Sequence, residues 1–245
     1  MGFDLVILAG AKNDKSLSEI SKEKYEALIN LNERALIDYV VETFKDIKVI
    51  DKIIIVGPKS IANRFDDVSY VPGQDSLIDS IKAGLELVES EYSMIATADI
   101  PLISVEAIEA FLSECSLDEA DFYYPIIPKE SIKRRFSKVK GTFINLVEGD
   151  FTGGNIFLLR KDSLLGLENF LEKTLKWRKK PWKLAYLLGF RFIIKLLTGQ
   201  LSLPLIEEEV YNLTNYKGKA VIMDYPEIGF DIDNEIEYRI MKKQM

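Results

Sequence analysis

Short apolar runs alternate with amphipathic stretches along the first half of the chain. The apolar run at 5–8 ends beside Gly10, a pattern typical of a strand buried within a parallel sheet. In the amphipathic stretch at 77–88, Leu77, Ile81 and Leu85 are expected to share the buried face of a helix. Further strands are predicted at 52–56, 68–71, 93–97 and 120–126, and further helices at 34–44 and 105–114. Elements in this order predict an α/β fold with a mainly parallel sheet and helices on both faces.

The second half of the chain adds strands and a longer helical region. Strands are predicted at 141–147, 155–159 and 219–223, and helices at 163–176 and 236–243. A basic stretch at 176–183 precedes an apolar stretch at 184–205, which two basic residues interrupt, so no stable membrane insertion is expected. We expect one domain over 1–245, with a helical insertion at 161–215 that packs on the sheet. Contact of this insertion with a membrane surface or an anionic lipid-like substrate is the alternative.

The composition limits the classes of function. Of the 245 residues, 47% are hydrophobic, which is enough to build a sizeable core. The net charge of −7 argues against a general nucleic-acid-binding surface, which would be basic. Because Cys115 is the single cysteine, no disulfide framework can form, and we expect a buried structural thiol. No basic region precedes the first apolar run, so we expect no signal peptide and a cytoplasmic location.

The chemistry must come from residues other than histidine, because the chain has none. This excludes Ser-His-Asp and Cys-His catalysis and leaves carboxylates, which favour a hard ion such as Mg²⁺. Asp99 follows the predicted strand at 93–97, at the edge where open α/β sheets bind ligands, so it suits a divalent cation; an Asx turn is the alternative. Asp231 and Asp233 point the same way if their segment is extended, and could complete that metal site. Capping of the last helix by Asp233 or Asn234 is the alternative.

Two segments suit a nucleotide or a phosphate group. The small residues at 9–11 let a ligand approach the backbone closely, and Lys15 or Lys24 could meet phosphate charge. An ordinary strand-to-helix turn with solvated lysines is the alternative. Gln74 and Ser76 precede a predicted helix, where polar side chains and backbone amides suit a base or a phosphate; plain helix capping is the alternative.

Two more segments have both a functional and a structural interpretation. Gly153 and Gly154 allow close backbone approach to a ligand, although local sequence alone favours a β-hairpin turn. Arg134, Arg135 and Lys138 lie in a predicted basic loop that could close over phosphates, and a solvated run of charges is the equal alternative.

Five segments of the chain resemble, in order, the motifs of one enzyme superfamily. Residues 8–10 are similar to its Leu-Ala-Gly-Gly opening, and residues 27–40 to its segment ending Lys-Pro-Leu-Ile-x-Tyr-Val. Residues 97–102 look like its metal-binding Gly-Asp-x-Pro-Leu strand end. Residues 153–156 resemble its Asn-x-Gly-Ile strand, and residues 231–235 its Asp-x-Asp segment near the end. The superfamily is that of the nucleotidyltransferases related to molybdenum-cofactor guanylyltransferase and the sugar-nucleotide pyrophosphorylases.

The resemblance implies a Rossmann-like fold and transfer of a nucleoside monophosphate from a nucleoside triphosphate to a phosphorylated acceptor, with release of pyrophosphate. It implies Mg²⁺ held by Asp99 with Asp231 or Asp233. Lys15, Lys24 and Asp99 are the implied catalytic residues. The implied nucleotide contacts are Leu8, Ala9, Gly10, Ala11, Gln74, Ser76, Thr97 and Ala98, and the implied acceptor contacts are Gly153, Gly154 and Asn155.

One departure from the superfamily keeps other functions open. The glycine-rich loop continues at 11–15 as Ala-Lys-Asn-Asp-Lys, without the arginine that the superfamily carries. A non-catalytic nucleotide-binding or partner-binding module on the same fold is therefore the first alternative. A glycosyltransferase that uses a nucleotide sugar is the second, with 231–233 as its metal motif.

Overall fold

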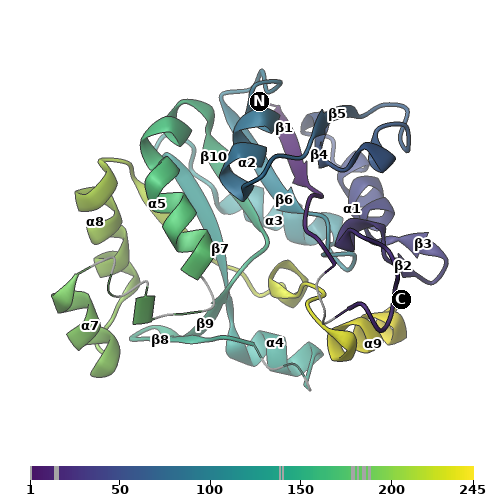
Figure 1. Cartoon of the computed structure of the whole chain (residues 1–245). Coiled ribbons are helices and arrows are strands. Elements are labelled where there is room, and N and C mark those ends of the chain that lie inside the picture. The colour runs from purple at the N-terminus through teal and green to yellow at the C-terminus, as the bar shows by residue number, and fades with distance from the viewer. Residues whose placement is uncertain are drawn as a thin grey trace.

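A mixed sheet flanked by helices forms the centre of the computed structural model (Figure 1). The structure describes residues 2–13, 17–137, 139, 141–177, 180, 182–183, 186 and 189–245. These residues form a sheet of nine strands, in the order β5-β4-β1-β6-β10-β7-β9-β8, with β11 also paired to β7. The strands are β1 (Phe3–Leu8), β4 (Ile50–Gly57), β5 (Ser69–Pro72), β6 (Tyr92–Thr97), β7 (Phe122–Pro128), β8 (Ile144–Leu146), β9 (Gly149–Gly153), β10 (Ile156–Arg160) and β11 (Gly218–Ile222).

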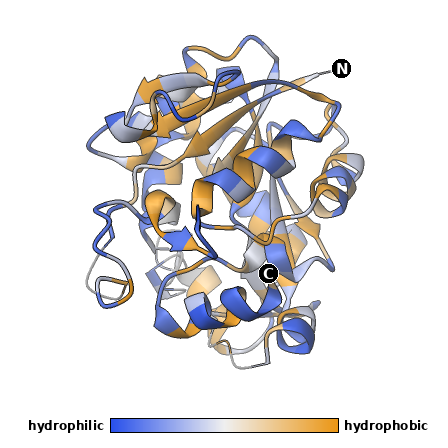
Figure 2. Ribbon diagram, turned by 90° about the vertical axis from the view of Figure 1, so that its right-hand side faces the viewer, coloured by the Kyte–Doolittle hydropathy of each residue, from blue (hydrophilic) through white to orange (hydrophobic). Residues whose placement is uncertain are grey.

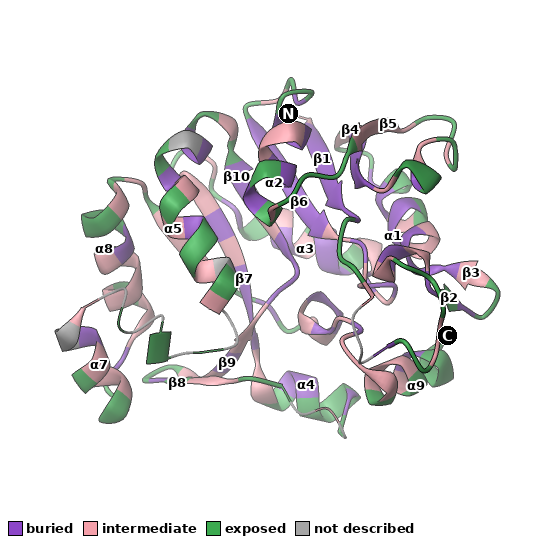
Figure 3. Cartoon of the chain, viewed as in Figure 1, coloured by how far each residue is buried: buried purple, intermediate pink, exposed green. Residues whose placement is uncertain are grey.

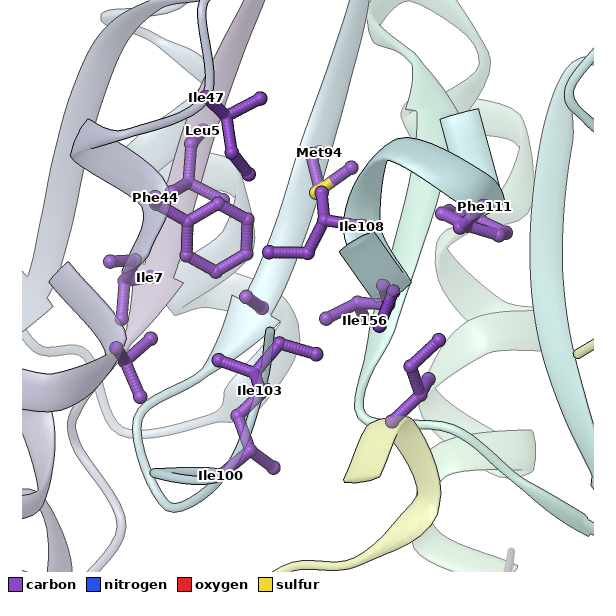
Figure 4. Packing of buried hydrophobic residues seen from close by; sticks show 14 of the residues in the cluster. Leu5, Ile7, Phe44, Ile47, Met94, Ile100, Ile103, Ile108, Phe111 and Ile156 are labelled. Atoms are coloured by element: carbon purple, nitrogen blue, oxygen red, sulfur yellow. The ribbon is translucent and has the colours of Figure 1, made fainter. Parts of the chain in front are cut away.

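Helices cover both faces of the sheet, because alternate strand residues are buried on opposite sides. Leu5 of β1 points toward Phe44 of α1 and lies in one cluster with Ile108 of α3 (Figure 4). Val6, its neighbour in β1, lies in a second cluster with Ile81 of α2 and with residues of α5. The helices are α1 (Leu36–Lys45), α2 (Leu77–Leu85), α3 (Val105–Glu114), α4 (Lys129–Arg135), α5 (Leu164–Trp177), α7 (Phe190–Leu197), α8 (Leu203–Thr214) and α9 (Glu235–Gln244). Short 3-10 turns are η1 (Glu26–Leu28), η2 (Lys59–Ile61), η3 (Lys161–Ser163) and η4 (Pro226–Gly229).

The strands β1, β4, β5 and β6 run parallel to one another and are largely apolar, as the hydropathy colours of Figure 2 show for the sheet. The strand β10 then pairs antiparallel with both β6 and β7. The predicted Rossmann-like, mainly parallel but mixed sheet is therefore confirmed. The carboxyl ends of β1, β4 and β6 lie at one edge of the sheet, where parallel α/β sheets bind ligands.

The strands β9 and β10 both pair antiparallel with β7, and the ladder of paired residues is interrupted between them. Ile126 of β7 pairs with Gly153, and Tyr123 pairs with Leu158. Three steps along β7 thus match five steps along its partner, so two extra residues bulge out of the ladder. The bulge falls at Gly154 and Asn155. Gly153 and Gly154 therefore do not form the hairpin turn that local sequence favours, because the chain continues in the same direction through them.

Other local predictions need correction. Leu77 is 44% exposed rather than buried, because it is the first residue of α2 and precedes the apolar face formed by Ile78, Ile81 and Leu85. Residues 34–35, predicted as the start of a helix, instead form β3 (Arg34–Ala35), which pairs with β2 (Asn30–Leu31). The strand predicted at 141–147 is reduced to β8, and the polar strand β9 was not predicted.

The region predicted as a helical insertion contains η3, α5, α7 and α8 among its described residues. The helices α7 and α8 lie at the opposite end of the molecule from β5 (Figure 1). They carry many exposed and half-buried residues, whereas β1 and β6 are almost entirely buried (Figure 3). Within the described part of the chain, no helix is long and apolar enough to cross a membrane. That 1–245 is one domain and 161–215 an insertion within it stays a prediction.

Candidate functional site

The carboxyl ends of three strands are tied together at the expected edge of the sheet. The Ala9 N–H donates to the Val56 carbonyl at 2.8 Å, and the Ala98 N–H donates to the Leu8 carbonyl at 3.2 Å. A Cβ added to Gly57 would lie 3.0 Å from the Ala9 Cβ, so the small residues permit this close packing. These contacts place the predicted nucleotide residues Leu8, Ala9, Thr97 and Ala98 at one edge.

The loop that follows β1 is exposed and closes on itself. Gly10 and Ala11 are exposed, and a Cβ on Gly10 would meet nothing within 4 Å, so a ligand has room to reach the backbone there. The Ala11 carbonyl accepts from the Glu26 N–H at 3.0 Å, and the Lys24 carbonyl accepts from the Asn13 N–H at 2.9 Å. These two backbone hydrogen bonds therefore hold the start of the loop, at 11–13, close to its end, at 24–26.

The two lysines predicted to be catalytic belong to this loop. Lys24 is exposed, and its ammonium lies 5.6 Å from the centroid of the Tyr25 ring. Lys15 lies outside the described residues. Their catalytic roles stay predictions.

Gln74 and Ser76 are both engaged locally. The Ser76 hydroxyl accepts from the Asp79 N–H at 3.0 Å and donates to the Asp79 carboxylate at 2.6 Å, so Ser76 is the N-cap of α2. The Gln74 amide nitrogen donates to the Pro72 carbonyl at 2.7 Å. The capping alternative for Ser76 is therefore confirmed, and a role of either residue in binding a base stays a prediction.

Asp99 and the segment at 229–233 lie side by side. The Ile232 N–H donates to the Asp99 carbonyl at 3.2 Å. Ile232 is fully buried in an apolar cluster, whereas Asp231 and Asp233 on either side of it line a cavity, as the alternation of an extended segment predicts. Asn234 caps α9 by accepting from two backbone N–H groups at 2.9 and 3.1 Å, so the capping alternative also holds.

The donor chemistry of this edge fits magnesium. No group of three or more acidic, cysteine or histidine side chains within the described part of the chain is placed to hold one metal ion. Mg²⁺ does not need such a cage, because it is usually bound by one or two carboxylates together with substrate phosphates and waters. Asp99 and one of the neighbouring aspartates would supply that number of carboxylates, and their role as metal ligands stays a prediction.

Asn155 joins the end of β6 to η4. Its backbone N–H donates to the Ile228 carbonyl at 2.8 Å, and its own carbonyl accepts from the Thr97 N–H at 3.1 Å. Because Asn155 is buried, these bonds explain its position structurally. The hydroxyl oxygen of Thr97 is also buried and has no hydrogen-bond partner among the described residues. Such a group commonly bonds water or a ligand.

The two glycines before Asn155 are fixed by close packing within the protein. A Cβ on Gly153 would lie 2.1 Å from the Tyr124 hydroxyl oxygen, and a Cβ on Gly154 would lie 2.7 Å from Ile228. Both glycines also line the same cavity as Asp231 and Asp233. They therefore have a structural role, and an acceptor-binding role stays a prediction.

The predicted basic loop near residue 134 is instead a helix. Arg134 and Arg135 belong to α4, while Lys138 lies outside the described residues. Arg134 pairs with Asp224 at 2.9 Å, and Arg135 pairs with Glu227 at 2.5 Å. Ser131 and Ile132 bury one side of this helix, and Arg135 ties it to η4 through Glu227. Closure of these basic residues over phosphates stays a prediction.

A large cavity was not foreseen from the sequence. Its volume is about 510 Å³, and it lies between the sheet and α5, α7 and α8. It also reaches Glu237 of α9, a residue that sequence reasoning missed, whose carboxylate accepts from the Asp233 N–H at 2.8 Å. Most of the lining side chains are apolar and come from segments far apart in the chain, so no local signal separates them from core residues.

The single cysteine is a buried structural thiol, as expected. Cys115 is 8% exposed, and burial raises the pKa of its thiol to about 12. A thiol that stays protonated is a poor nucleophile. Cys115 therefore contributes to packing beside α3, away from the candidate site.

The chain is similar to known nucleotidyltransferases in sequence. It is 29% identical over 129 residues to a probable molybdenum cofactor guanylyltransferase of Natranaerobius thermophilus, covering 50% of this chain and 59% of the relative. It is 31% identical over 145 residues to a 2-C-methyl-D-erythritol 4-phosphate cytidylyltransferase of Clostridium perfringens, covering 52% of this chain and 60% of the relative. The chain thus spans about three fifths of the length of these curated relatives.

Solved structures agree on the fold. A hypothetical transferase from Thermus thermophilus matches with a TM-score of 0.84 and 30% identity, covering 97% of this chain and 100% of that one. The 4-diphosphocytidyl-2C-methyl-D-erythritol synthase of Anaerococcus prevotii matches with a TM-score of 0.60 and 14% identity, covering 99% and 98%, and supports the fold alone. The family model of the MobA-like NTP transferase domain matches residues 5–178, most of the chain. The protein therefore belongs to the MobA-like NTP transferase family.

Proposed function

We propose that this protein transfers a nucleoside monophosphate from a nucleoside triphosphate to a phosphorylated acceptor in a Mg²⁺-dependent reaction. The observation that carries the proposal is the hydrogen-bonded convergence of Leu8, Asp99, Asn155 and Ile232 at the carboxyl edge of the sheet. Membership of the MobA-like NTP transferase family supports it. The same membership favours nucleotidyl transfer over the glycosyltransferase alternative.

In this proposal the chain contributes mainly positioning. The exposed backbone at Gly10 and Ala11 receives the triphosphate, and the buried Thr97 hydroxyl is the polar group nearest the strand end that can bond to the nucleotide. Asp99 and Asp231 or Asp233 hold Mg²⁺. When bound, the ion neutralises triphosphate charge and orients the α-phosphate.

The reaction itself needs no strong base. An oxygen of the acceptor phosphate forms a bond to the α-phosphorus while the bond from that phosphorus to the bridging oxygen breaks. Pyrophosphate leaves with the electron pair of the broken bond. A phosphate oxygen is already ionised at neutral pH, so a chain without histidine can support the step by positioning and by charge neutralisation.

Thermal unfolding with ATP, GTP, CTP or UTP, with and without Mg²⁺, tests the proposal. One nucleotide at about 100 times its Kd should stabilise the protein by about 2.7 kcal/mol in the presence of Mg²⁺. Asp99→Asn should lose this shift, because a carboxylate ligand is removed. The matched control is Asp66→Asn, an exposed aspartate outside the site, which should keep the shift. The absence of any shift with all four nucleotides contradicts the proposal.

Nucleotide binding without turnover is a second candidate function. The loop at 11–15 favours this second candidate, because it lacks the arginine that the nucleotidyltransferase superfamily carries there. Pyrophosphate release separates the two candidates. A Mg²⁺-dependent thermal shift without pyrophosphate release, over a panel of sugar phosphates and alkyl phosphates, supports the binding module.

A further inference from the structure

The cavity beside the candidate site is polar at one border and largely apolar elsewhere, with Thr174, Glu207 and Lys219 as polar residues of the remaining lining. Gly153, Gly154 and Asp231 line it at the carboxyl edge of the sheet, next to Asn155 and Asp233. Its volume of about 510 Å³ lies within the range of about 300–1,000 Å³ that is usual for pockets that bind small molecules. The cavity is therefore continuous with the residues that the proposed function assigns to the acceptor.

Aromatic and aliphatic side chains form the body of the cavity. Phe122, Tyr124 and Ile126 of β7 line it, whereas Tyr123 and Ile127, at odd-numbered positions of the same strand, are buried in the core on the other face. Phe157 of β10 and Phe170 of α5 continue the same lining. Water in such a space finds few hydrogen-bond partners, so an apolar ligand fills it more favourably than a sugar does.

The helix α7 forms one wall of the cavity, and it carries apolar side chains both toward the cavity and toward the outside of the protein. Phe192 of α7 is 4% exposed and lines the cavity together with Leu196. Ile194 and Leu197 of the same helix are 46% and 80% exposed. A surface helix of a globular protein usually turns polar residues outward.

Two aromatic residues that precede α7 in the sequence are exposed as well. Trp182 and Tyr186 are 63% and 78% exposed, and the basic residues Lys180 and Lys183 beside them are also exposed. Exposed aromatic side chains among lysines are typical of proteins that touch a lipid surface. A ligand with a hydrocarbon tail is held in a lipid membrane by that tail, and it would enter the cavity from the membrane.

We infer that the acceptor is an amphiphile, a phosphate monoester with a hydrocarbon tail. Its phosphate lies at Gly153–Asn155, beside Asp231 and Asp233, and its tail occupies the apolar cavity. This inference rests on the proposed function, because the phosphate is the group that attacks the nucleotide. It adds the chemical class of the acceptor to that proposal.

Calorimetric titration with butyl, octyl and dodecyl phosphate, each below its critical micelle concentration, tests the inference on the full chain. The Kd should fall about fourfold for each added methylene until the cavity is filled, the change that corresponds to about 0.8 kcal/mol per methylene. The binding heat capacity should become more negative in the same order. A Kd that does not depend on chain length overturns the inference.

Filling the cavity gives a matched pair of variants. Ile206→Trp, on α8, places a larger side chain in the cavity and should remove the gain from butyl to dodecyl phosphate. Leu213→Trp lies on the same helix, is 50% exposed and is outside the lining, so it should keep the gain. If Ile206→Trp does not fold, Ala220→Leu on β11 fills less of the same space. A filled variant that folds and retains the full gain contradicts the inference.

The nucleotide experiment on the same samples separates the two proposals. A nucleotide shift without dependence on chain length overturns the amphiphile inference and leaves the proposed function standing. Dependence on chain length without any nucleotide shift contradicts the proposed function, and with it the assignment of the amphiphile as an acceptor.

Discussion

At the scale of single residues, glycines in the candidate site are present for different reasons. Gly154 is enclosed, since an added Cβ would lie 2.7 Å from Ile228 and 2.8 Å from Pro125. Gly10 is open, since an added Cβ would meet nothing within 4 Å. A residue identity that packing does not require is more informative about a ligand than one that packing explains. Gly10 is therefore the better marker of the proposed nucleotide site.

Alanine substitution distinguishes the two glycines. Gly154→Ala should lower the free energy of unfolding by about 1–3 kcal/mol, because the new methyl group overpacks the space against Ile228 and Pro125. Gly10→Ala should leave stability unchanged or raise it by up to about 1 kcal/mol, because it only restricts the unfolded chain. Urea unfolding measures both. Gly10→Ala should in addition weaken nucleotide binding in the thermal experiment, and equal stability losses in the two variants would refute this distinction.

At the scale of elements, the hairpin of β2 and β3 shows how a turn can override a helical pattern. Two residues, Asn32 and Glu33, connect the strands, and both have positive φ, at 49° and 72°. Positive φ at both positions is the requirement of a type I′ turn, which matches the twist of the strands it joins. Asparagine adopts this conformation readily, whereas glutamate is strained by its Cβ.

Relief of that strain is measurable. Glu33→Gly should raise the free energy of unfolding by about 0.5–1 kcal/mol, because the loss of left-handed strain exceeds the added chain entropy of glycine. Asn32→Gly is the matched control and should change stability by less, since asparagine tolerates the conformation. Chemical denaturation compares the two variants with the wild type. Destabilisation by Glu33→Gly would show that the side chain makes a contact stronger than the strain.

The elements also show what local sequence can and cannot predict. The strands β1, β4 and β6 were predictable because most of their residues are buried on both faces, so these strands are short apolar runs in the sequence. The strand β9 was not, since its Asp150 and Thr152 give no such run and its pairing with β7 is non-local. The strand ends were sufficient to locate the candidate site at the edge of the sheet. The cavity was not predictable, because Phe122 and Phe192 lie far apart in the sequence and come to line the same cavity only in the folded chain.

At the scale of the whole molecule, the buried Cys115 thiol makes the free energy of unfolding depend on pH. Burial raises the pKa of the Cys115 thiol from 9.0 to about 12. The folded state therefore holds this proton more tightly than the unfolded state. The resulting contribution to stability is fully present below pH 9 and is lost as the pH rises toward 12.

The loss should be visible as a difference between two proteins. Between pH 9 and 11, the wild type should lose stability more steeply than Cys115→Ala, by at most about 1.4 kcal/mol per pH unit. Burial also raises the pKa values of Tyr92 and Tyr123, and this contribution cancels because both proteins contain them. The Cys115 charge adds a smaller rise in the pKa of Tyr123 in the wild type, which acts in the same direction as the expected difference. Urea unfolding at several pH values measures the slopes, which should coincide between pH 6 and 8. Equal slopes above pH 9 would show that the thiol ionises without cost in the folded protein.

The hydrogen bond from Ile232 to Asp99 has a consequence for the order of events during synthesis. Every described strand of the sheet has been synthesised before residues 228–233 are made, since β11 ends at Ile222. Domains begin to fold while their chains are still growing. On the proposed function, a nascent chain would contain all the described strands of its sheet before it acquires Asp231 and Asp233. Catalysis would thus begin only once residues 231–233 have been made, and chains that stop short of them would not consume nucleotide.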